Sequence, residues 1–427
     1  MPFCYHQLVP ALTCSNIMKI AASSLWQPCM RYVECDVKEL AMPNVMSDLM
    51  RGVTPRHWLM LSAGILCCLG LVMVASASMV AGETKYGSTF YFLSRHLIWM
   101  GIAFCAGAVA MRVPVNLLQK YSVFLLCFAG VLLIVVLVPG IGRRINGSMR
   151  WIGLGPLTFQ PSEVAKLAVV LYMGSFLVRK QEEVRSGWWG FARPMLVVLI
   201  GVGLLLMEPD FGASVVMMSA AMAMLFLAGT PLLTFAVMIS VAAVGAVLLV
   251  ILEPYRLKRL LSFTDPWADQ FNSGYQLSQS LIAFGRGEWF GVGLGRSVQK
   301  LSYLPEAHTD FVFAVYAEEF GLIGVLLMIS LFWMLVRSAI RIGQEAELSG
   351  KFYAAYIAYG ISVLIGVQTL FNIGVNMGLF PTKGLTLPLV SYGGSSLAMV
   401  FVMLGILLRI DTENKQPLPV VRKGGLS

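Results

Sequence analysis

Long runs of apolar residues recur along the chain and constrain its fold more than any other feature of the sequence. A helix that crosses the hydrocarbon core of a membrane needs about 20 predominantly apolar residues. Ten runs reach or approach this length, each bounded by charged residues, proline or glycine: 58–80, 92–111, 121–139, 161–178, 190–207, 211–229, 231–253, 311–336, 352–376 and 391–408. Only 12% of the residues are Asp, Glu, Lys or Arg. The sequence therefore predicts an all-α polytopic membrane protein with about ten transmembrane helices, and it excludes a soluble enzyme or an outer-membrane barrel.

The basic residues of the connections indicate how such a bundle is oriented. An even number of spans places both ends of the chain on one side of the membrane. One set of short connections, together with the C-terminal end, holds 13 Lys and Arg residues, whereas the opposite short loops hold 6. Basic loops stay on the cytoplasmic side. Residues 1–57 and 412–427 are therefore predicted cytoplasmic tails, residues 58–411 form the membrane domain, and its long loop 254–310 faces outward into the periplasm.

The net charge of +9 has the same origin, since basic residues collect in cytoplasmic loops and face anionic lipid. The sequence has no basic stripe with interleaved aromatic residues, the pattern that would indicate a nucleic-acid partner. The eight cysteines form no C-x-x-C pair and the four histidines are scattered, so the sequence predicts no zinc site. Residues 1–57 contain no signal-peptide pattern, and a start at Met46 or Met50 would leave a short basic tail instead.

An ionisable side chain at mid-membrane costs at least about 2.5–3.5 kcal/mol on insertion scales, so one within a span needs an explanation. Two charged residues fall near the start of the fourth run. Glu163 and Lys166 are three residues apart, which places them on one helix face within ion-pair distance. Pro161 before them suits the first turn of a helix. The pair either holds neighbouring helices together or supplies a cation to a polar cavity, and the spacing leaves both interpretations open.

The densest polar cluster, residues 303–310, ends the long outer loop directly before the eighth run. It includes Glu306, His308, Thr309 and Asp310. Thr309 or Asp310 could cap the following helix. An acid at the mouth of a membrane protein, beside His308 and Glu306, is equally where a general base would lie.

Other polar residues have several interpretations. Glu318 and Glu319 lie inside the eighth run, where one could face a cavity and the other a polar neighbour. Glu208 and Asp210 flank a proline and suit a turn that begins a helix. Five glycines within 285–295 do not form a nucleotide-binding motif and indicate tight turns. The outer basic residues could bind a pyrophosphate-bearing lipid or anionic headgroups; they are Arg143, Arg144, Arg150, Arg256, Lys258, Arg259, Arg286, Arg296, Lys300 and Lys383.

Four longer stretches carry a resemblance to a known family. They read NGSMRWIGLGPLTFQPSEVAK at 146–166, EPDFG at 208–212, DPWADQFNSGYQLSQSLIAFGRGEWFGVGLGRSVQKLSYLPEAHTDF at 265–311 and PTKGLTLPLVSYGGSS at 381–396. Together with the apolar runs, they resemble the SEDS family (shape, elongation, division and sporulation) over about residues 58–411. The sequences of these stretches are closer to the cell-division branch of this family than to its elongation branch.

The resemblance implies an inner-membrane peptidoglycan glycosyltransferase that polymerises lipid II at the division septum, together with a class B penicillin-binding protein and other divisome proteins. It also implies that Asp310 is the essential catalytic residue and that Glu163 and Lys166 form a charge pair beside the central cavity. No cofactor is evident; a divalent cation, Mg²⁺ or Mn²⁺, is compatible with the reaction, and Asp310 could contact it. On the matching stretches we expect further substrate contacts from Arg150, Gln160, Glu306, His308, Lys383, Ser391 and Ser395.

The chemistry agrees with a single acid in an outer groove. A sugar hydroxyl attacks poorly while protonated, and a carboxylate within hydrogen-bond reach can take its proton. The lipid pyrophosphate that leaves needs Arg, Lys or a divalent cation. Inversion in one displacement needs one base and no covalent intermediate, which suits Asp310. Two rivals remain: a lipid II flippase, which needs access from both faces, and a non-catalytic scaffold for the penicillin-binding protein, which would tolerate loss of Asp310.

Overall fold

The computed structural model describes residues 54–145, 148–154, 157–251, 263, 265–272, 274–381 and 384–415. The chain divides into two units, Met1–Thr54 and Pro55–Ser427, and the helices described below belong to the second. Nearly all of the predicted N-terminal tail, most of the predicted C-terminal tail and Lys383 lie outside the described residues.

Each of the ten apolar runs forms a helix, as predicted. Within the described residues, eight helices are long and apolar enough to cross a membrane: α4 (Pro55–Tyr86), α5 (Tyr91–Arg112), α6 (Val115–Leu137), α7 (Pro161–Arg179), α9 (Trp188–Met207), α14 (Val312–Leu348), α15 (Phe352–Asn376) and α16 (Gly394–Asn414). The sixth and seventh runs form the shorter apolar helix α10 (Phe211–Leu227) and α11 (Leu232–Ile251). The predicted fold class, an all-α polytopic membrane protein, is confirmed.

Helix boundaries differ from the apolar runs where charge ends a run without ending the helix. Helix α14 continues to Leu348, although its run was predicted to end at 336. Arg337 lies on this extension with its guanidinium 5.1 Å from the centroid of the Trp333 ring. A long basic side chain can extend along an apolar surface while its head reaches water, so the helix needs no break at the charge.

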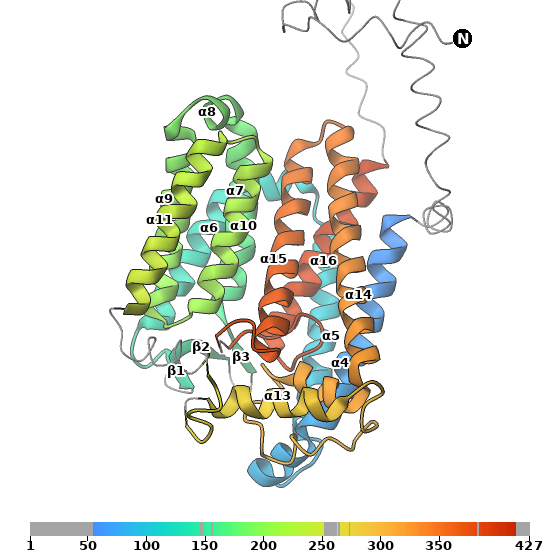
Figure 1. Cartoon of the computed structure of the whole chain (residues 1–427). Coiled ribbons are helices and arrows are strands. Elements are labelled where there is room, and N and C mark those ends of the chain that lie inside the picture. The colour runs from blue at the N-terminus through green and yellow to red at the C-terminus, as the bar shows by residue number, and fades with distance from the viewer. Residues whose placement is uncertain are drawn as a thin grey trace, which may run out of the picture. The chain divides into compact units, whose positions relative to one another are not determined.

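A small antiparallel sheet between α6 and α7 was not predicted. Strand β2 (Ser148–Leu154) is central and pairs with β1 (Gly142–Ile145) on one side and β3 (Leu157–Phe159) on the other. The sheet and α13 (Tyr275–Gly287) lie at the same end of the helices, here termed the sheet end (Figure 1). At the opposite end, the short helix α8 (Gln181–Ser186) joins α7 to α9 (Figure 1).

The burial pattern is that of a protein whose solvent is lipid. Large apolar side chains such as Phe104 and Phe124 are 68% exposed on the outside of the helices. Charged and polar side chains, in contrast, are buried within the bundle, Lys166 among them. Helices α7 and α15 are the most enclosed of the long helices. Polar groups at membrane depth face the bundle interior because hydrocarbon cannot solvate them, so the interior is where a functional site is expected.

Candidate active site

Asp310 lies immediately before α14 at the sheet end, and its backbone is held by the neighbouring helix α15. Its carbonyl oxygen accepts hydrogen bonds from Nδ2 of Asn372 at 2.9 Å and of Asn376 at 3.0 Å. The Oδ1 atom of Asn376 accepts from the backbone amide of Ala314 at 3.1 Å. Two buried amides one helical turn apart therefore fix the position of Asp310 against α15.

The predicted helix-capping role of Thr309 or Asp310 is wrong. Phe311 is the N-cap residue of α14 and makes no capping hydrogen bond with its side chain; the first-turn amide of Ala314 is satisfied by Asn376 instead. The Thr309 hydroxyl instead donates to Oε2 of Glu306 at 2.9 Å. The Asp310 carboxylate is thus not used for capping, which leaves the interpretation as a base.

The surroundings of the Asp310 carboxyl favour its protonated form more than water does. Burial, then the charge of Glu306, raise its pKa to about 7; Arg150 acts to lower the pKa and Asp210 to raise it. A Cβ atom placed on Gly384 would lie 3.1 Å from Asp310 Oδ2, so this glycine keeps the chain close to the carboxylate without blocking it. A pKa near 7 is the range in which a carboxylate is an effective general base.

Arg150 connects the small sheet to the turn between α9 and α10. Its guanidinium donates to the backbone oxygens of Glu208, at 3.2 Å, and Pro209, and it lies 3.8 Å from Oδ1 of Asp210. The Arg150 side chain is 23% exposed, so its charge remains accessible to a ligand. The predicted outer cation therefore lies close enough to influence the pKa of Asp310.

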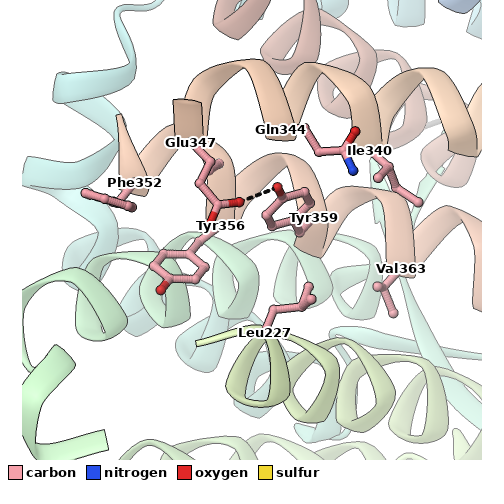
Figure 2. A pocket seen from close by; sticks show the side chains of 9 residues that line it. Leu227, Ile340, Gln344, Glu347, Phe352, Tyr356, Tyr359 and Val363 are labelled. Atoms are coloured by element: carbon pink, nitrogen blue, oxygen red, sulfur yellow. Dashed lines mark hydrogen bonds between the residues drawn. The ribbon is translucent and has the colours of Figure 1, made fainter. Parts of the chain in front are cut away.

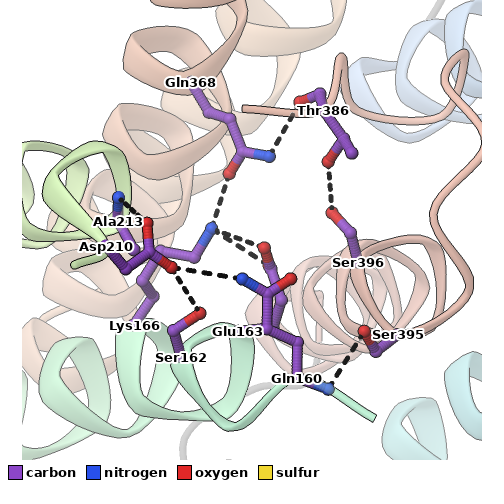
Figure 3. A network of polar contacts seen from close by, with 10 residues as sticks. All are labelled: Gln160, Ser162, Glu163, Lys166, Asp210, Ala213, Gln368, Thr386, Ser395 and Ser396. Atoms are coloured by element: carbon purple, nitrogen blue, oxygen red, sulfur yellow. Dashed lines mark hydrogen bonds and ion pairs between the residues drawn. The ribbon is translucent and has the colours of Figure 1, made fainter. Parts of the chain in front are cut away.

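Asp210 contacts both Arg150 of the small sheet and polar residues at the start of α7. Figure 3 shows its contacts with α7. Its Oδ1 caps α10 by accepting from the amide of Ala213 at 3.2 Å, which confirms the capping interpretation. Its Oδ2 accepts from Nε2 of Gln160 at 3.2 Å and from the hydroxyl of Ser162 at 3.3 Å. Asp210 was not among the site residues predicted from the sequence, where it was interpreted as part of a turn that begins a helix.

Lys166 is buried deeper in the bundle and is paired as its spacing predicted. Its Nζ atom lies 3.0 Å from both carboxylate oxygens of Glu163 and donates to Oε1 of Gln368 at 2.7 Å. The amide of Gln368 donates in turn to the backbone oxygen of Thr386 at 3.0 Å, and the Thr386 hydroxyl donates to Ser396 at 3.1 Å. Figure 3 shows this chain of polar contacts running from α7 through α15 to the segment before α16.

The remaining predicted residues hold the same region together. The backbone amide of Gln160 donates to the hydroxyl oxygen of Ser395 at 3.3 Å, and the Ser391 hydroxyl accepts from the amide of Leu387 at 2.8 Å. His308 is buried between two aromatic rings, and burial lowers its pKa. Its ring centroid lies 4.5 Å from that of Phe92 and 5.7 Å from that of Tyr392.

Three amide side chains on α15 were missed by the sequence analysis. Gln368, Asn372 and Asn376 recur every four residues within an apolar run, which places them on one face of the helix. All three are buried and contact site residues: Gln368 contacts Lys166, and the two asparagines contact Asp310. This spacing of polar residues inside a span was the signal that could have identified them.

A cavity in the described part of the chain lies away from this site. It has a volume of about 270 Å³, opens between α14, α15 and the end of α10, and contains Glu347, which accepts a hydrogen bond from the Tyr359 hydroxyl at 2.6 Å (Figure 2). These residues belong to the end of α14 opposite Asp310, so the cavity is not part of the site. Among the described residues, no three His, Cys, Asp or Glu side chains converge as a metal site would require.

Comparison with known proteins places this arrangement in a family. The family model of FtsW, RodA and SpoVE, described as "Cell cycle protein", matches residues 56–416. Two relatives are named "Probable peptidoglycan glycosyltransferase FtsW". The one from Pseudomonas fluorescens is 55% identical over 350 residues, covering 82% of this chain and 86% of the relative. The one from Coxiella burnetii is 54% identical over 359 residues, covering 84% and 96%.

Solved structures agree with these sequence matches. A chain from "Structural coordination of polymerization and crosslinking by a peptidoglycan synthase complex" is 29% identical and superposes with a TM-score of 0.70, over 84% of this chain and 98% of that one. The crystal structure of the Thermus thermophilus rod shape determining protein RodA is 28% identical, with a TM-score of 0.60 over 84% and 97%. The chain therefore belongs to the FtsW, RodA and SpoVE family of cell cycle proteins, as its resemblance to the SEDS family predicted.

Proposed function

We propose that the chain is a peptidoglycan glycosyltransferase that polymerises lipid II into glycan strands during septal cell-wall synthesis, with Asp310 as its general base. The names of relatives about half identical over most of its length support the activity. The observation that carries the role of Asp310 is its placement outside the spans. Two asparagines of α15 hold its backbone carbonyl, and the charge of the partly exposed Arg150 acts on the pKa of its carboxyl.

The proposed reaction is a single inverting displacement. A hydroxyl oxygen of the acceptor sugar forms a bond to the anomeric carbon of the donor, and the bond from that carbon to the lipid pyrophosphate breaks. The hydroxyl proton passes to the Asp310 carboxylate, which contributes roughly 10²–10⁴-fold to the rate as a general base. Arg150 lies where it could stabilise negative charge on the leaving pyrophosphate.

The inner polar network would shape the floor of this site. Lys166 is neutralised by Glu163 and fixed by Gln368, so we expect it to orient the surrounding hydroxyl and amide groups. The hydrogen bond between Gln160 and Ser395 joins the N-terminal ends of α7 and α16. These groups could hydrogen-bond the sugar and amide groups of the substrate, which is the role expected from the sequence.

We further propose that the sheet end faces the periplasm, that both termini are cytoplasmic, and that the protein acts in the inner membrane at the septum. The excess of 13 over 6 basic residues in the short connections supports this orientation. A class B penicillin-binding protein is the proposed partner, supported by the structural neighbour from a peptidoglycan synthase complex. A reporter fused within 265–272 should be periplasmic and one fused after 415 cytoplasmic; reversed signals would refute the orientation.

The deciding experiment is the conversion of lipid II to glycan strands by the purified protein with its partner, comparing Asp310→Asn with wild type. We expect almost complete loss of polymer for Asp310→Asn. Asp265→Asn is a matched control, because Asp265 accepts from the amides of Trp267 and Ala268 in an exposed turn of the same loop, and asparagine serves that role as well.

The rival functions give different outcomes in the same preparation. A flippase would still move lipid II across vesicles after Asp310→Asn, and a scaffold would still activate the penicillin-binding protein. Full-length glycan strands from a folded Asp310→Asn protein would refute the base assignment.

A further inference from the structure

Helix α14 is interrupted at Gly321, and a segment of the preceding loop fills the break. Gly321 has φ 64° and ψ −165°, which removes it from the helical conformation. The carbonyls of Glu318 and Glu319 accept from the amides of Val292, at 2.9 Å, and Gly293, at 3.1 Å. Beyond the break, the amides of Leu322 and Ile323 donate to the carbonyls of Glu288, at 2.9 Å, and Trp289, at 3.2 Å. Residues 288–293, here the clasp segment, thus satisfy backbone groups that an interrupted membrane helix would leave unpaired.

The glycines of this region allow the close approach. A Cβ atom on Gly287 would lie 2.1 Å from the carbonyl oxygen of Ala317, and one on Gly291 would lie 2.1 Å from that of Glu319. Gly291 also has a φ of +79°, which favours glycine. The glycine series was predicted to give tight turns, and Gly291, Gly293 and Gly295 do have positive φ in the turns of this region. Gly287 and Gly291 also permit contact between two backbones.

Two buried acids fix the loop immediately after the clasp segment. Glu318 accepts from the hydroxyl of Ser297 at 2.5 Å and from the amides of Val298, at 3.0 Å, and Gln299, at 3.3 Å. Arg286 lies 3.6 Å from the same carboxylate. Each carboxylate oxygen of Glu318 is therefore engaged by the loop.

Within the described part of the chain, Glu319 pairs with one cation, Lys300. The Nζ atom of Lys300 lies 2.9 Å from its Oε1, and the Ser76 hydroxyl of α4 donates to the same oxygen at 2.9 Å. Lys300 also donates to Ser76 at 2.8 Å. The side chains of Lys300 and Glu319 are 9% and 0% exposed. This three-residue contact joins the loop, α14 and α4 in a buried region. Opposite charges attract more strongly there than in water, and removing one partner would leave the other charge buried and uncompensated.

The loop that ends in Asp310 is thus held to α14 by the clasp segment and by residues 297–299, and Lys300 is the last of these contacts before Asp310 itself. It is fixed to α4 and α14 at Lys300, and ten residues later the carbonyl of Asp310 is fixed to α15. We propose that Lys300 is a positioning residue for glycosyl transfer: through Glu319 and Ser76 it sets where the loop places the Asp310 carboxylate. The proposal rests on the role of Asp310 as base given above. A displacement of about 1 Å at a reacting group can cost about 100-fold in rate.

The test compares Lys300→Met, Lys300→Arg and the double variant Lys300→Met/Glu319→Leu in lipid II polymerisation, with thermal denaturation of each purified complex. Lys300→Met should lower kcat about 10- to 100-fold while KM stays within about twofold, because the substrate contacts remain. Lys300→Arg should recover part of kcat. Lys180→Met is the matched control, since Lys180 forms an exposed pair with Glu183 at the opposite end of the bundle, and its kcat should not change.

The double variant separates positioning from stability. It removes the unpaired acid that Lys300→Met would leave, so we expect its thermal midpoint to return towards wild type while kcat remains low. Recovery of kcat together with the thermal midpoint would overturn the proposal and make the pair purely structural. An unchanged kcat in a folded Lys300→Met protein would do the same. Failure of the base assignment would be visible separately, as an active Asp310→Asn protein.

Discussion

The raised pKa of Asp310 predicts how polymerisation should depend on pH. A general base acts only when it is deprotonated. With a pKa of about 7, about 9% of the Asp310 carboxyls are ionised at pH 6 and about 90% at pH 8, so kcat/KM should rise about tenfold over this range. A carboxyl with an ordinary pKa is fully ionised at both values and would give no change.

The causes of this pKa predict the direction in which two variants should move the pH profile. Removing the negative charge at position 306 by Glu306→Gln takes away a charge that raises the pKa, so the rise in activity should move to lower pH. Removing the positive charge by Arg150→Met takes away one that lowers the pKa, so the rise should move to higher pH. Both shifts are read from the position of the rise, independently of any change in the maximum rate.

The assay is initial-rate polymerisation of lipid II at low substrate concentration between pH 5.5 and about 8.5, at constant ionic strength because exposed charges are screened by salt. Folding at each pH is checked by thermal denaturation. A flat wild-type profile between pH 6 and about 8, or shifts of the two variants in the same direction, would show that Asp310 is not the titrating base.

Three further results are expected. Lys166→Met leaves the Glu163 carboxylate buried without its cation, which costs about 3–5 kcal/mol, so the folded yield should fall. Replacing both residues by apolar ones should restore the yield. A normal folded yield from the single variant would refute the buried pair. Gly384→Ala places a Cβ beside the carboxylate of Asp310. If Asp310 is the base as proposed, this change should lower kcat about tenfold without changing the thermal midpoint, while Gly130→Ala, which meets nothing within 4 Å, should leave kcat unchanged. Glu208 is fully buried, and burial, then Asp210, raise its pKa to about 8. Because the folded state then holds this proton more tightly than the unfolded state, stability falls as pH rises from about 4.5 to 8, by about 1.4 kcal/mol per unit. Glu208→Gln should therefore be more stable than wild type at pH 8 and not at pH 5, and equal thermal midpoints at both would contradict this.

The helices could be predicted from sequence because the feature that defines them is local. Twenty apolar residues need a membrane whatever the rest of the chain does, and all ten runs became helices. Prediction from the local pattern fails where a helix continues past a charged residue, as at Arg337. It also fails where a helix is interrupted although no charged residue ends the apolar run, as at Gly321. The small sheet was missed because its strands are three to seven residues long and lie between spans.

The site was predictable to the extent that its residues are close in sequence. Glu163 and Lys166 pair within one turn, and their contact followed from their spacing. Gln368 joins them from 202 residues away, and Asp210 reaches Gln160 across 50 residues. A single sequence carries no signal of such pairings, so polar residues spaced along one face of an apolar helix are the most that could have been noticed.

The partners of the acids in α14 have a consequence for the order of membrane insertion. Ser76, Ser297 and Lys300 all precede Glu318 and Glu319 in the chain, so they have left the ribosome before α14 does. The two carboxylates can therefore enter the bilayer with their hydrogen-bond donors and countercharge already synthesised. Lys166 has its countercharge three residues before it, but it acquires Gln368 only when α15 has been made. Assembly of the bundle should thus close first around α4 and α14 and last around the polar floor of the site.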